Sequence, residues 1–555
     1  MRNTLIMTLA GALLGTAVLA QQGPHGKVKI KSKPGRTAAA PAPAAAPAPP
    51  TDWSVPYAAS ITPDGLRKDL SVLASDEYEG RETGTKGQRM AADYISKRFT
   101  ALGLAGPVQG SDNAYIQHFT LESRSWGDGI SLKVGKQAFQ WGKDFYSASG
   151  DSPFPTETEL QFVFAGYGLD LPNYSDYTGL DVTGKDVIVL AGEPLDAQGK
   201  SLLGTDGKSV KLTGPGNMVT AATKHGARSI LILDTNADDF ATTLERVASY
   251  IKQPRLVAAG QTAPKRTAAF RLGPAASYAL LHTNGATLKK YEAATTAAGK
   301  PVKASFKPTK TTLAAPRKVE PLATENVLGY LEGGDKKDEL VVMSAHYDHL
   351  GVKDGKVFNG ADDDGSGTVS VLSFADAFVQ AKKDGHGPRR SILFLANTGE
   401  EEGLLGSQYY TDHPVFPLES TVADVNIDMV GRVDPEHEGK GDYVYIVGAD
   451  KLSSELNAVS EATNQKYNPI ALDYKYNDPN DPEHIYYRSD HYNFAKHKIP
   501  VAFYTSGLHA DYHKETDEVD KINFPAMARR DQLIFHTAWE LANRDNRPVV
   551  DSNKP

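Results

Sequence analysis

The sequence contains no cysteine among its 555 residues. This absence excludes a disulfide framework, a lipid-anchored N-terminal cysteine and a zinc site built from thiolates. Basic residues are also fewer than acidic ones. The sequence has 60 lysines and arginines and 68 aspartates and glutamates, which gives a formal net charge of −8. A nucleic-acid-binding surface usually carries an excess of basic residues, so we expect no nucleic-acid partner.

Long apolar runs are scarce as well, and the first 20 residues have the features of a cleaved export signal. Arg2 precedes a short apolar stretch, and Val18 and Ala20 occupy the −3 and −1 positions of a cleavage site after residue 20. A membrane anchor is the alternative, but the stretch is short and interrupted by glycine and threonine, so no stable anchor is expected. We therefore predict a signal peptide at residues 1–20 and a secreted or periplasmic protein.

The rest of the chain divides by composition. Residues 21–52 are rich in proline and alanine and indicate an extended linker without a core of its own. Residues 53–150 begin with two helical patterns, the second of which ends at Gly103. Residues 151–300 lack a cluster of histidines and carboxylates. We interpret them as a small α/β or β-rich domain inserted between residues 53–150 and 301–555.

The last part of the chain alternates apolar strands with helices. Such alternation predicts an α/β fold with a largely parallel central sheet flanked by helices on both faces. Ligand sites in these sheets lie beyond the carboxyl ends of the strands. The strands that matter most are ELVVMSA at 339–345, SILFLANT at 391–398, ADVNIDMV at 423–430 and IPVAFYTS at 499–506.

Side chains that can bind a metal ion stand at or after the carboxyl end of each of these strands. Acids before a helix are often N-caps, and runs of glutamate are often solvated, but their recurrence at one edge of one sheet favours a shared site. In chain order the residues are His346, Asp348, Asp362, Asp363 and Asp364, then Glu400, Glu401 and Glu402, then Asp428, and last His509 and His513.

This set of side chains predicts a zinc centre. Imidazole and carboxylate ligands without thiolate suit Zn²⁺ in a catalytic site. The set is too large for one tetrahedral ion, which favours two ions that share a carboxylate, as in aminopeptidases and phosphatases. Asp348 stands two residues after His346 and is expected to orient that imidazole through its second nitrogen. His349 is left with a supporting or structural role.

Five segments together resemble a known family. HYDHLG, GADDDGSG, GEEEGLLGS, NIDMVGR and GLHADYHKETDEVDKI occur in the order typical of the co-catalytic zinc exopeptidases, which include bacterial leucyl aminopeptidase, aminopeptidase Y and the related glutamate carboxypeptidase II. Residues 164–194 and the following AATKHGARSILIL are similar to a protease-associated domain. The resemblance implies a peptidase domain made of residues 53–150 and 301–555, with a protease-associated insert at 151–300.

The resemblance also implies roles for single residues. Asp363 matches the bridging carboxylate, and Asp364 follows it, typically through a cis peptide bond. Glu400 matches the general base. The remaining metal ligands match His346, Glu401, Asp428 and His513.

Two features depart from the family pattern. Three acids, Glu400 to Glu402, stand where two are common, and the spacing to GLLGS supports the first two. His509 competes with His513 for the last ligand position, but the sequence Asp-Tyr-His before a Thr-Asp pair favours His513.

The implied function is that of an exported zinc aminopeptidase with two zinc ions per subunit, which hydrolyses N-terminal residues from peptides. A metal-activated water would attack, with Glu400 as its general base. The alternatives on the same scaffold are a carboxypeptidase or a dipeptidase, for which Arg432 and Arg488 could hold a substrate carboxylate. A glutaminyl cyclase and a non-catalytic binding module are further alternatives.

Overall fold

The computed structural model describes residues 51–149, 151–196, 198–203, 215–261, 266–304, 306–467 and 469–552. The predicted signal peptide and nearly all of the predicted linker lie outside these ranges. Residues 52–555 form one compact unit.

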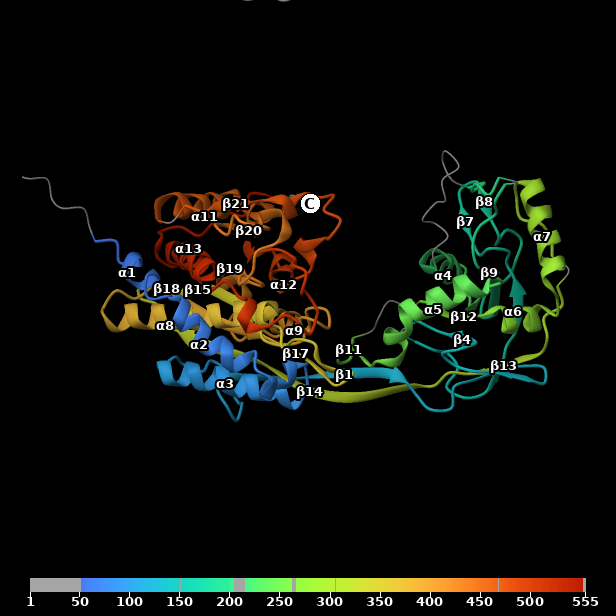
Figure 1. The fold of residues 1–555 in the computed structure, drawn as a ribbon, viewed down its shortest axis with the longest axis horizontal. Helices are drawn as coiled ribbons and strands as arrows, with labels where there is room; N and C mark the ends of the chain where they lie inside the picture. The colour runs from blue at the N-terminus through green and yellow to red at the C-terminus, as the bar shows by residue number, and fades with distance from the viewer. Residues whose placement is uncertain are drawn as a thin grey trace, which may run out of the picture. The chain divides into compact units, whose positions relative to one another are not determined.

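A nine-stranded sheet forms the centre of the fold, with the strand order β11-β1-β14-β18-β15-β19-β22-β20-β21 (Figure 1). The strands β18, β15, β19 and β22 are parallel to their neighbours within this group, whereas β11, β1 and β14 run antiparallel to theirs. Strand β20 is antiparallel to β22 and parallel to β21. The predicted α/β fold with a largely parallel, helix-flanked central sheet is confirmed. The strands span Ile116–Trp126 (β1), Arg255–Ala258 (β11), Arg317–Leu331 (β14), Lys336–His346 (β15), Arg390–Asn397 (β18), Thr421–Ile427 (β19), Tyr443–Val447 (β20), Ala471–Asp473 (β21) and Val501–Thr505 (β22).

Helices cover both faces of this sheet because its central strands are apolar on both sides. Val341 and Met343 of β15 face one core, which contains residues of α2, α3, α8 and α13, while Leu340 and Val342 face a second core with residues of α9, α10 and α12. Continuous apolar strands of this kind are typical of buried parallel sheets. The helices span Pro63–Leu73 (α2), Lys86–Leu102 (α3), Gly367–Lys383 (α8), Leu405–Asp412 (α9), Ala449–Leu452 (α10), Ser454–Tyr467 (α11), His491–Lys496 (α12) and Phe524–Asn543 (α13).

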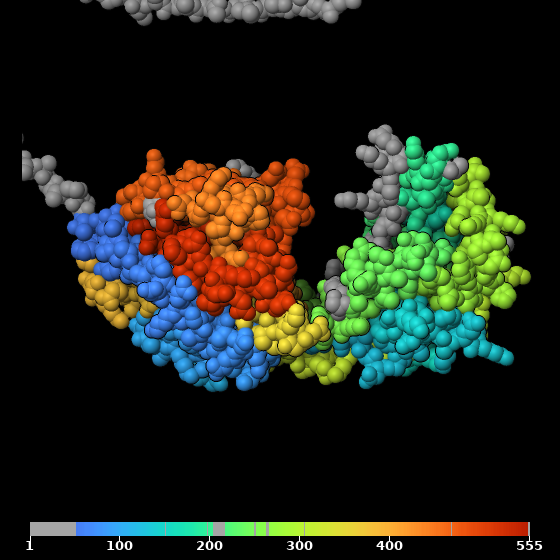
Figure 2. All heavy atoms as spheres, in the orientation of Figure 1, coloured from blue at the N-terminus to red at the C-terminus, as the bar shows by residue number. Residues whose placement is uncertain are grey.

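The two ends of the described chain pack on each other. Helices α1 (Ser54–Ala58) and α2 contact α13, and Figure 2 shows the blue N-terminal residues lying against the red C-terminal ones. Pro63 and the Thr62 cap begin α2, and Gly103 in the left-handed conformation ends α3, as expected from their sequences. A short 3₁₀ segment, Asp76–Arg81, lies between these helices and reaches the candidate site.

The inserted part contains two sheets with an apolar core of their own. A five-stranded sheet has the order β4-β12-β10-β9-β6, in which β12, β10, β9 and β6 are parallel, and a four-stranded antiparallel sheet has the order β3-β2-β13-β5. The strands and helices span Ser131–Val134 (β2), Gln137–Phe139 (β3), Phe145–Tyr146 (β4), Thr158–Glu159 (β5), Phe162–Phe164 (β6), Asp186–Leu190 (β9), Ser229–Leu233 (β10), Ala268–Leu272 (β12), Thr311–Ala314 (β13), Pro215–Lys224 (α4), Ala237–Lys252 (α5), Pro274–Leu281 (α6) and Gly285–Ala298 (α7).

Among the helices that the structure describes, none combines the length and the apolar character that crossing a membrane requires.

Candidate metal centre and active site

The carboxyl ends of the parallel strands bring the predicted site residues together. Strand β15 ends at His346, the segment after β18 carries Glu400 and Glu401, and Asp428 directly follows β19. Asp363 lies in a turn before α8. These side chains are buried, with exposed fractions of 1% for His346, 3% for Asp363 and 8% for Asp428. Residues far apart in the chain thus meet at one edge of the sheet, as the topology predicts.

A first group of possible metal ligands contains His346, Asp363 and Asp428. The Nε2 atom of His346 lies 3.3 Å from Asp363 Oδ1 and 3.7 Å from Asp428 Oδ2. The same nitrogen lies 3.7 Å from Glu400 Oε2. One imidazole and two carboxylates, gathered around one point, are a common arrangement for a divalent ion.

A second group contains His349, Asp363 and Glu401 and shares Asp363 with the first. His349 Nδ1 lies 2.8 Å from Glu401 Oε1 and 3.9 Å from Asp363 Oδ2. His513 Nε2 approaches the same two carboxylates, at 3.1 Å from Glu401 Oε2 and 3.2 Å from Asp363 Oδ2. His349 was not predicted to bind a metal from the sequence. Its position three residues after His346, just past the end of β15, is the feature that could have indicated such a role.

The donor atoms of both groups fit a metal ion. Within the described part of the chain, His346 Nε2, both ring nitrogens of His349 and Glu401 Oε1 are buried and form no hydrogen bond of suitable geometry, although His349 Nδ1 and Glu401 Oε1 lie 2.8 Å apart. Leaving such atoms unpaired in the interior is costly, and a bound cation would satisfy them. Imidazole nitrogens and carboxylate oxygens are also the ligands that Zn²⁺ takes in hydrolases.

The carboxylates of the two ligand groups favour positive charge beside them. Burial alone would lower the pKa of His513, but hydrogen bonds to Asp363 and Glu401 raise it to about 10. Burial raises the pKa of Glu400 well above its ordinary value, and the negative charges of Asp428 and Glu401 raise it further, against the opposing effect of His346. A raised pKa makes the Glu400 carboxylate a stronger base, which suits a group that accepts a proton from water.

Asp348 is connected to the site differently from the prediction. His346 Nδ1 lies 3.1 Å from the backbone carbonyl oxygen of Asp348, whereas its distance to the Asp348 carboxylate is 3.6 Å. The carboxylate instead accepts hydrogen bonds from Thr83 Oγ1, at 2.9 Å, and from the backbone N–H of Glu400, at 3.2 Å. The backbone of Asp348 therefore orients His346, and its side chain holds the Glu400 segment.

Asp517 and His509 support the segment that carries Asp363. The Asp517 carboxylate accepts hydrogen bonds from the backbone N–H groups of Asp362 and Asp363, at 3.0 and 3.1 Å. His509 Nε2 lies 3.1 Å from Asp362 Oδ2 and belongs to neither ligand group. Asp364 accepts from the backbone N–H groups of Gly367 and Met429, and the peptide bond between Asp363 and Asp364 is cis.

Arg81 is a supporting residue that sequence reasoning missed. Its guanidinium is fully buried and donates to the backbone carbonyl groups of Leu73, Tyr347, Asn359 and Gly360, at 2.7–2.9 Å. It ties the N-terminal 3₁₀ segment to the two segments that carry His346 and Asp363. The sequence shows an arginine in a polar loop, and nothing in its local pattern indicates partners more than 260 residues away.

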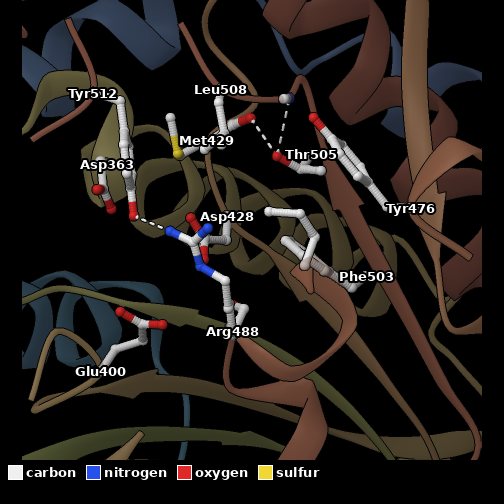
Figure 3. Close-up of a pocket in the computed structure, with 13 residues that line it drawn as sticks. Asp363, Glu400, Asp428, Met429, Tyr476, Arg488, Phe503, Thr505, Leu508 and Tyr512 are labelled. Atoms are coloured by element: carbon white, nitrogen blue, oxygen red, sulfur yellow. Dashed lines mark hydrogen bonds between the residues drawn. The ribbon is translucent and has the colours of Figure 1, made fainter. Parts of the chain in front are cut away.

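A cavity opens beside the two groups and has about 430 Å³ of empty space, part of it open to solvent (Figure 3). Asp363, Glu400 and Asp428 line its polar side. Arg488 lies across from Glu400 and donates from Nη2 to the Tyr512 hydroxyl at 2.9 Å. The other walls are mostly apolar and include Met429, Tyr476, Ile485, Phe503 and Leu508.

Residues 326–538 match the family model described as Peptidase family M28. This part of the chain is an M28 peptidase domain. The match includes both ligand groups and the cavity, so the geometry and the family assignment concern the same residues.

Named relatives match the M28 domain over part of their length. The chain is 31% identical over 214 residues to a probable leucine aminopeptidase of Trichophyton verrucosum, a match that covers 37% of this chain and 55% of the relative. It is 27% identical to aminopeptidase Y of Saccharomyces cerevisiae, over 40% of each chain. The chain spans about half of the length of the relatives that it matches.

A solved structure shares the fold over most of the chain. The aminopeptidase from Aneurinibacillus sp. strain AM-1 superimposes with a TM-score of 0.52 at 18% identity, covering 89% of this chain and 97% of the other. At this identity the similarity concerns the fold alone.

One prediction is wrong in the light of these relatives. The chain also matches vacuolar membrane proteases, for example that of Tuber melanosporum, at 38% identity over 96 residues, which cover 17% of this chain and 9% of the relative. A secreted or periplasmic location was predicted from the first 20 residues alone, and relatives with a vacuolar name contradict it.

Proposed function

We propose that the M28 domain is a zinc-dependent aminopeptidase that removes N-terminal residues from peptides. The observation that carries the proposal is the pair of ligand groups that share Asp363, next to Glu400 and an apolar cavity. The names of the relatives support the same activity. Both ligand groups together would hold two zinc ions, with His346, Asp363 and Asp428 around one and Asp363, Glu401 and a histidine around the other.

Bound zinc would polarise the scissile carbonyl group and lower the pKa of the attacking water. Glu400 would take the proton from that water and pass it to the leaving amine, a role that suits a buried carboxyl group with a raised pKa. Asp348 holds the backbone N–H of Glu400 and so fixes where this carboxyl group lies. The acids on the polar side of the cavity would attract the free α-amine of a substrate.

Tyr512 and the apolar walls of the cavity would contact the substrate. Because Arg488 donates to the phenol oxygen of Tyr512, the hydroxyl proton of Tyr512 is left to donate elsewhere, and the carbonyl oxygen of a substrate in the cavity is a suitable acceptor. The apolar walls, which include Phe503 and Leu508, would receive an apolar N-terminal side chain.

One observation favours a second activity on the same scaffold. Arg488 lines the cavity, where it also lies 3.5 Å from Glu483 and donates to Tyr512, whereas Arg432 is outside the lining and lies 2.8 Å from Asp511. A guanidinium in the cavity suits the carboxylate of a short substrate, as a dipeptidase or carboxypeptidase would require.

The proposal also includes the division of the chain into domains. Residues 53–150 and 301–555 would form the peptidase domain, with a protease-associated insert at 151–300. The support is that the inserted sheets have an apolar core of their own, in which Phe154 and Phe270 are buried.

The test is cleavage of aminoacyl p-nitroanilides, each paired with its N-acetylated form, with and without a chelator. We expect cleavage of the free-amine substrates only, loss of activity with chelator and recovery with zinc. Glu400→Gln is the matched control, since it should retain zinc without turnover. Cleavage of the acetylated substrates, or of peptides only from the carboxyl end, would contradict the proposal and favour the second activity.

A further inference from the structure

Thr83 lies in the loop between the 3₁₀ segment and α3, and it is buried, with an exposed fraction of 4%. Its Oγ1 atom lies 2.9 Å from Asp348 Oδ2 and 3.0 Å from the backbone nitrogen of Gly399, the residue before Glu400. Asp348 and Gly399 each follow the end of a strand, β15 and β18, and these two strands are parallel neighbours. One hydroxyl group from the N-terminal part of the chain therefore joins two strand-end segments of the centre.

The hydroxyl group of Thr83 has one proton to donate and two lone pairs with which to accept. The backbone N–H of Gly399 donates to one lone pair, and Thr398 Oγ1, at 3.1 Å, is a second uncharged neighbour. The Asp348 carboxylate is a charged acceptor, and hydrogen bonds to ionised groups are stronger than those between neutral groups. Thr83 therefore donates to Asp348 and accepts from the segment that leads into Glu400.

The Asp348 carboxylate stands between two donors, and both approach the same oxygen atom. Oδ1 accepts from the backbone N–H of Glu400 at 3.2 Å, whereas Nδ1 of His346 lies 3.6 Å from it, which is too long for a hydrogen bond. His346 Nδ1 lies 3.1 Å from the backbone carbonyl oxygen of Asp348 instead. The bond from Thr83 to Oδ2 restricts the rotation of the carboxylate, so it holds Oδ1 beside Glu400.

We propose that Thr83 is a positioning residue that keeps the Asp348 carboxylate on the Glu400 segment and away from His346. This inference rests on the proposed role of Glu400 as the general base. Without the hydroxyl group of Thr83, the backbone N–H of Gly399 loses its acceptor, and the carboxylate can turn toward His346 Nδ1.

These two changes affect different properties of the centre. A displaced Glu400 would accept the proton of the attacking water less efficiently, which lowers kcat. A carboxylate that accepts from His346 Nδ1 makes the imidazole a stronger metal ligand, so zinc affinity should stay the same or rise. A residue that only stabilises the fold would lower both or neither, and this difference separates a positioning role from a structural one.

The experiment compares the full chain with Thr83→Val, which removes the hydroxyl group, and Thr83→Ser, which keeps it. Steady-state kinetics on aminoacyl p-nitroanilides give kcat, competition with a chromogenic chelator gives zinc affinity, and mass spectrometry gives the hydrogen exchange of the peptide that contains Gly399 and Glu400. For Thr83→Val we expect kcat to fall about 10–100-fold, as for other groups that orient residues around a metal. Zinc affinity should be unchanged or raised, and the amides should exchange faster. Thr83→Ser should resemble the wild type in all three measurements.

Thr295→Val is the matched control. Thr295 is also buried, and its hydroxyl group donates to the backbone carbonyl oxygen of Tyr291 at 3.1 Å, within α7 of the inserted part. The same substitution at this position should leave kcat, zinc affinity and the exchange of Gly399 and Glu400 unchanged.

Equal kcat in Thr83→Val and the wild type would overturn the proposal, as would equal losses in Thr83→Val and Thr83→Ser or a fall in zinc affinity in Thr83→Val. If the wild type itself cleaves no p-nitroanilide, the proposed function fails, and the exchange measurement still tests the contact. Unchanged exchange of Gly399 and Glu400 in Thr83→Val would then overturn it.

A second variant is used if Thr83→Val fails to fold by circular dichroism. Asp348→Asn removes the charge that holds Thr83 and Glu400, so kcat should fall. Zinc affinity should be retained, because the backbone carbonyl group of Asp348 still accepts from His346. Loss of zinc affinity in Asp348→Asn would show that the carboxylate supports His346 and would overturn the proposal.

Discussion

Replacing Arg81 by lysine tests whether this buried side chain holds the zinc centre in place. Arg81 donates four hydrogen bonds to backbone carbonyl groups, at 2.7–2.9 Å. The positive charge also faces the buried carboxylates of Asp348 and Asp364. A lysine keeps the charge but donates from one nitrogen atom, so it cannot reach all four carbonyl oxygens that surround the planar guanidinium.

The size of the effect follows from the lost bonds. If two of the four are lost, the free energy of unfolding should fall by about 3 kcal/mol or more, because hydrogen bonds to charged groups contribute ~1.5–3 kcal/mol each. For the unit of residues 52–555, with an unfolding entropy of about 2.1 cal/mol/K per residue, that corresponds to a fall in Tm of about 3 °C or more. Since Arg81 holds the segments of His346 and Asp363, zinc affinity should also fall, by about 10–100-fold as for other groups that orient metal ligands.

A second buried arginine provides the matched control. Arg390 is also fully buried and donates to the carbonyl groups of Leu541, Arg544 and Asp545, but it lies at the opposite end of β18 from Glu400. Arg390→Lys should lower Tm without changing zinc affinity. Calorimetry gives Tm, and competition with a chromogenic chelator gives the affinity. Equal zinc affinity in Arg81→Lys and Arg390→Lys would refute the reasoning.

Three further predictions address the centre and the core. Glu400→Gln should lower kcat by about 10²–10⁴-fold with zinc content unchanged, as measured by steady-state kinetics and elemental analysis. His349→Ala and His513→Ala should each reduce the zinc content seen by native mass spectrometry, because both imidazoles contact Glu401. Burial raises the pKa of Asp531 from 3.8 to about 8, against the opposing effects of its hydrogen bond with Ser370 and the charge of Arg530, so the folded state holds a proton that the unfolded chain releases. Stability should therefore fall as the pH rises from about 4 to about 8, and Asp531→Asn should flatten that part of the slope in urea unfolding.

Contrary results would be informative for each of these. Loss of zinc from Glu400→Gln would make Glu400 a ligand instead of a general base. Full zinc content in His349→Ala would leave His513 as the histidine of the second group. A pH slope unchanged by Asp531→Asn would place its origin in other carboxyl groups.

The sequence predicts the strands that position the site better than it predicts the contacts around it. Strands β15, β18, β19 and β22 occur where apolar runs were found, because buried parallel strands are apolar on both faces. The antiparallel direction of β14 was not predicted, since a strand's apolar pattern carries no information about the direction of its neighbour.

The side chains that support the site are harder to predict than the ligands. His346, Asp363 and Asp428 stand at strand ends or before a helix, and the topology alone brings such positions together. His349 shares its segment with His346, and only the three-dimensional distances reveal its closeness to Glu401. Arg81 depends entirely on contacts between distant segments, which local patterns do not contain.

The hydrogen bonds from Asp362 and Asp363 to Asp517 have a consequence for how the protein is made. The segment that carries the shared carboxylate is held by a side chain about 155 residues further along the chain, and His513 lies beside it. A ribosome must therefore release residue 517, about 155 residues after Asp362, before this part of the centre can form. A chain that stops or is cut before residue 513 lacks both contacts, so the segment of the shared carboxylate loses the side chain that holds it.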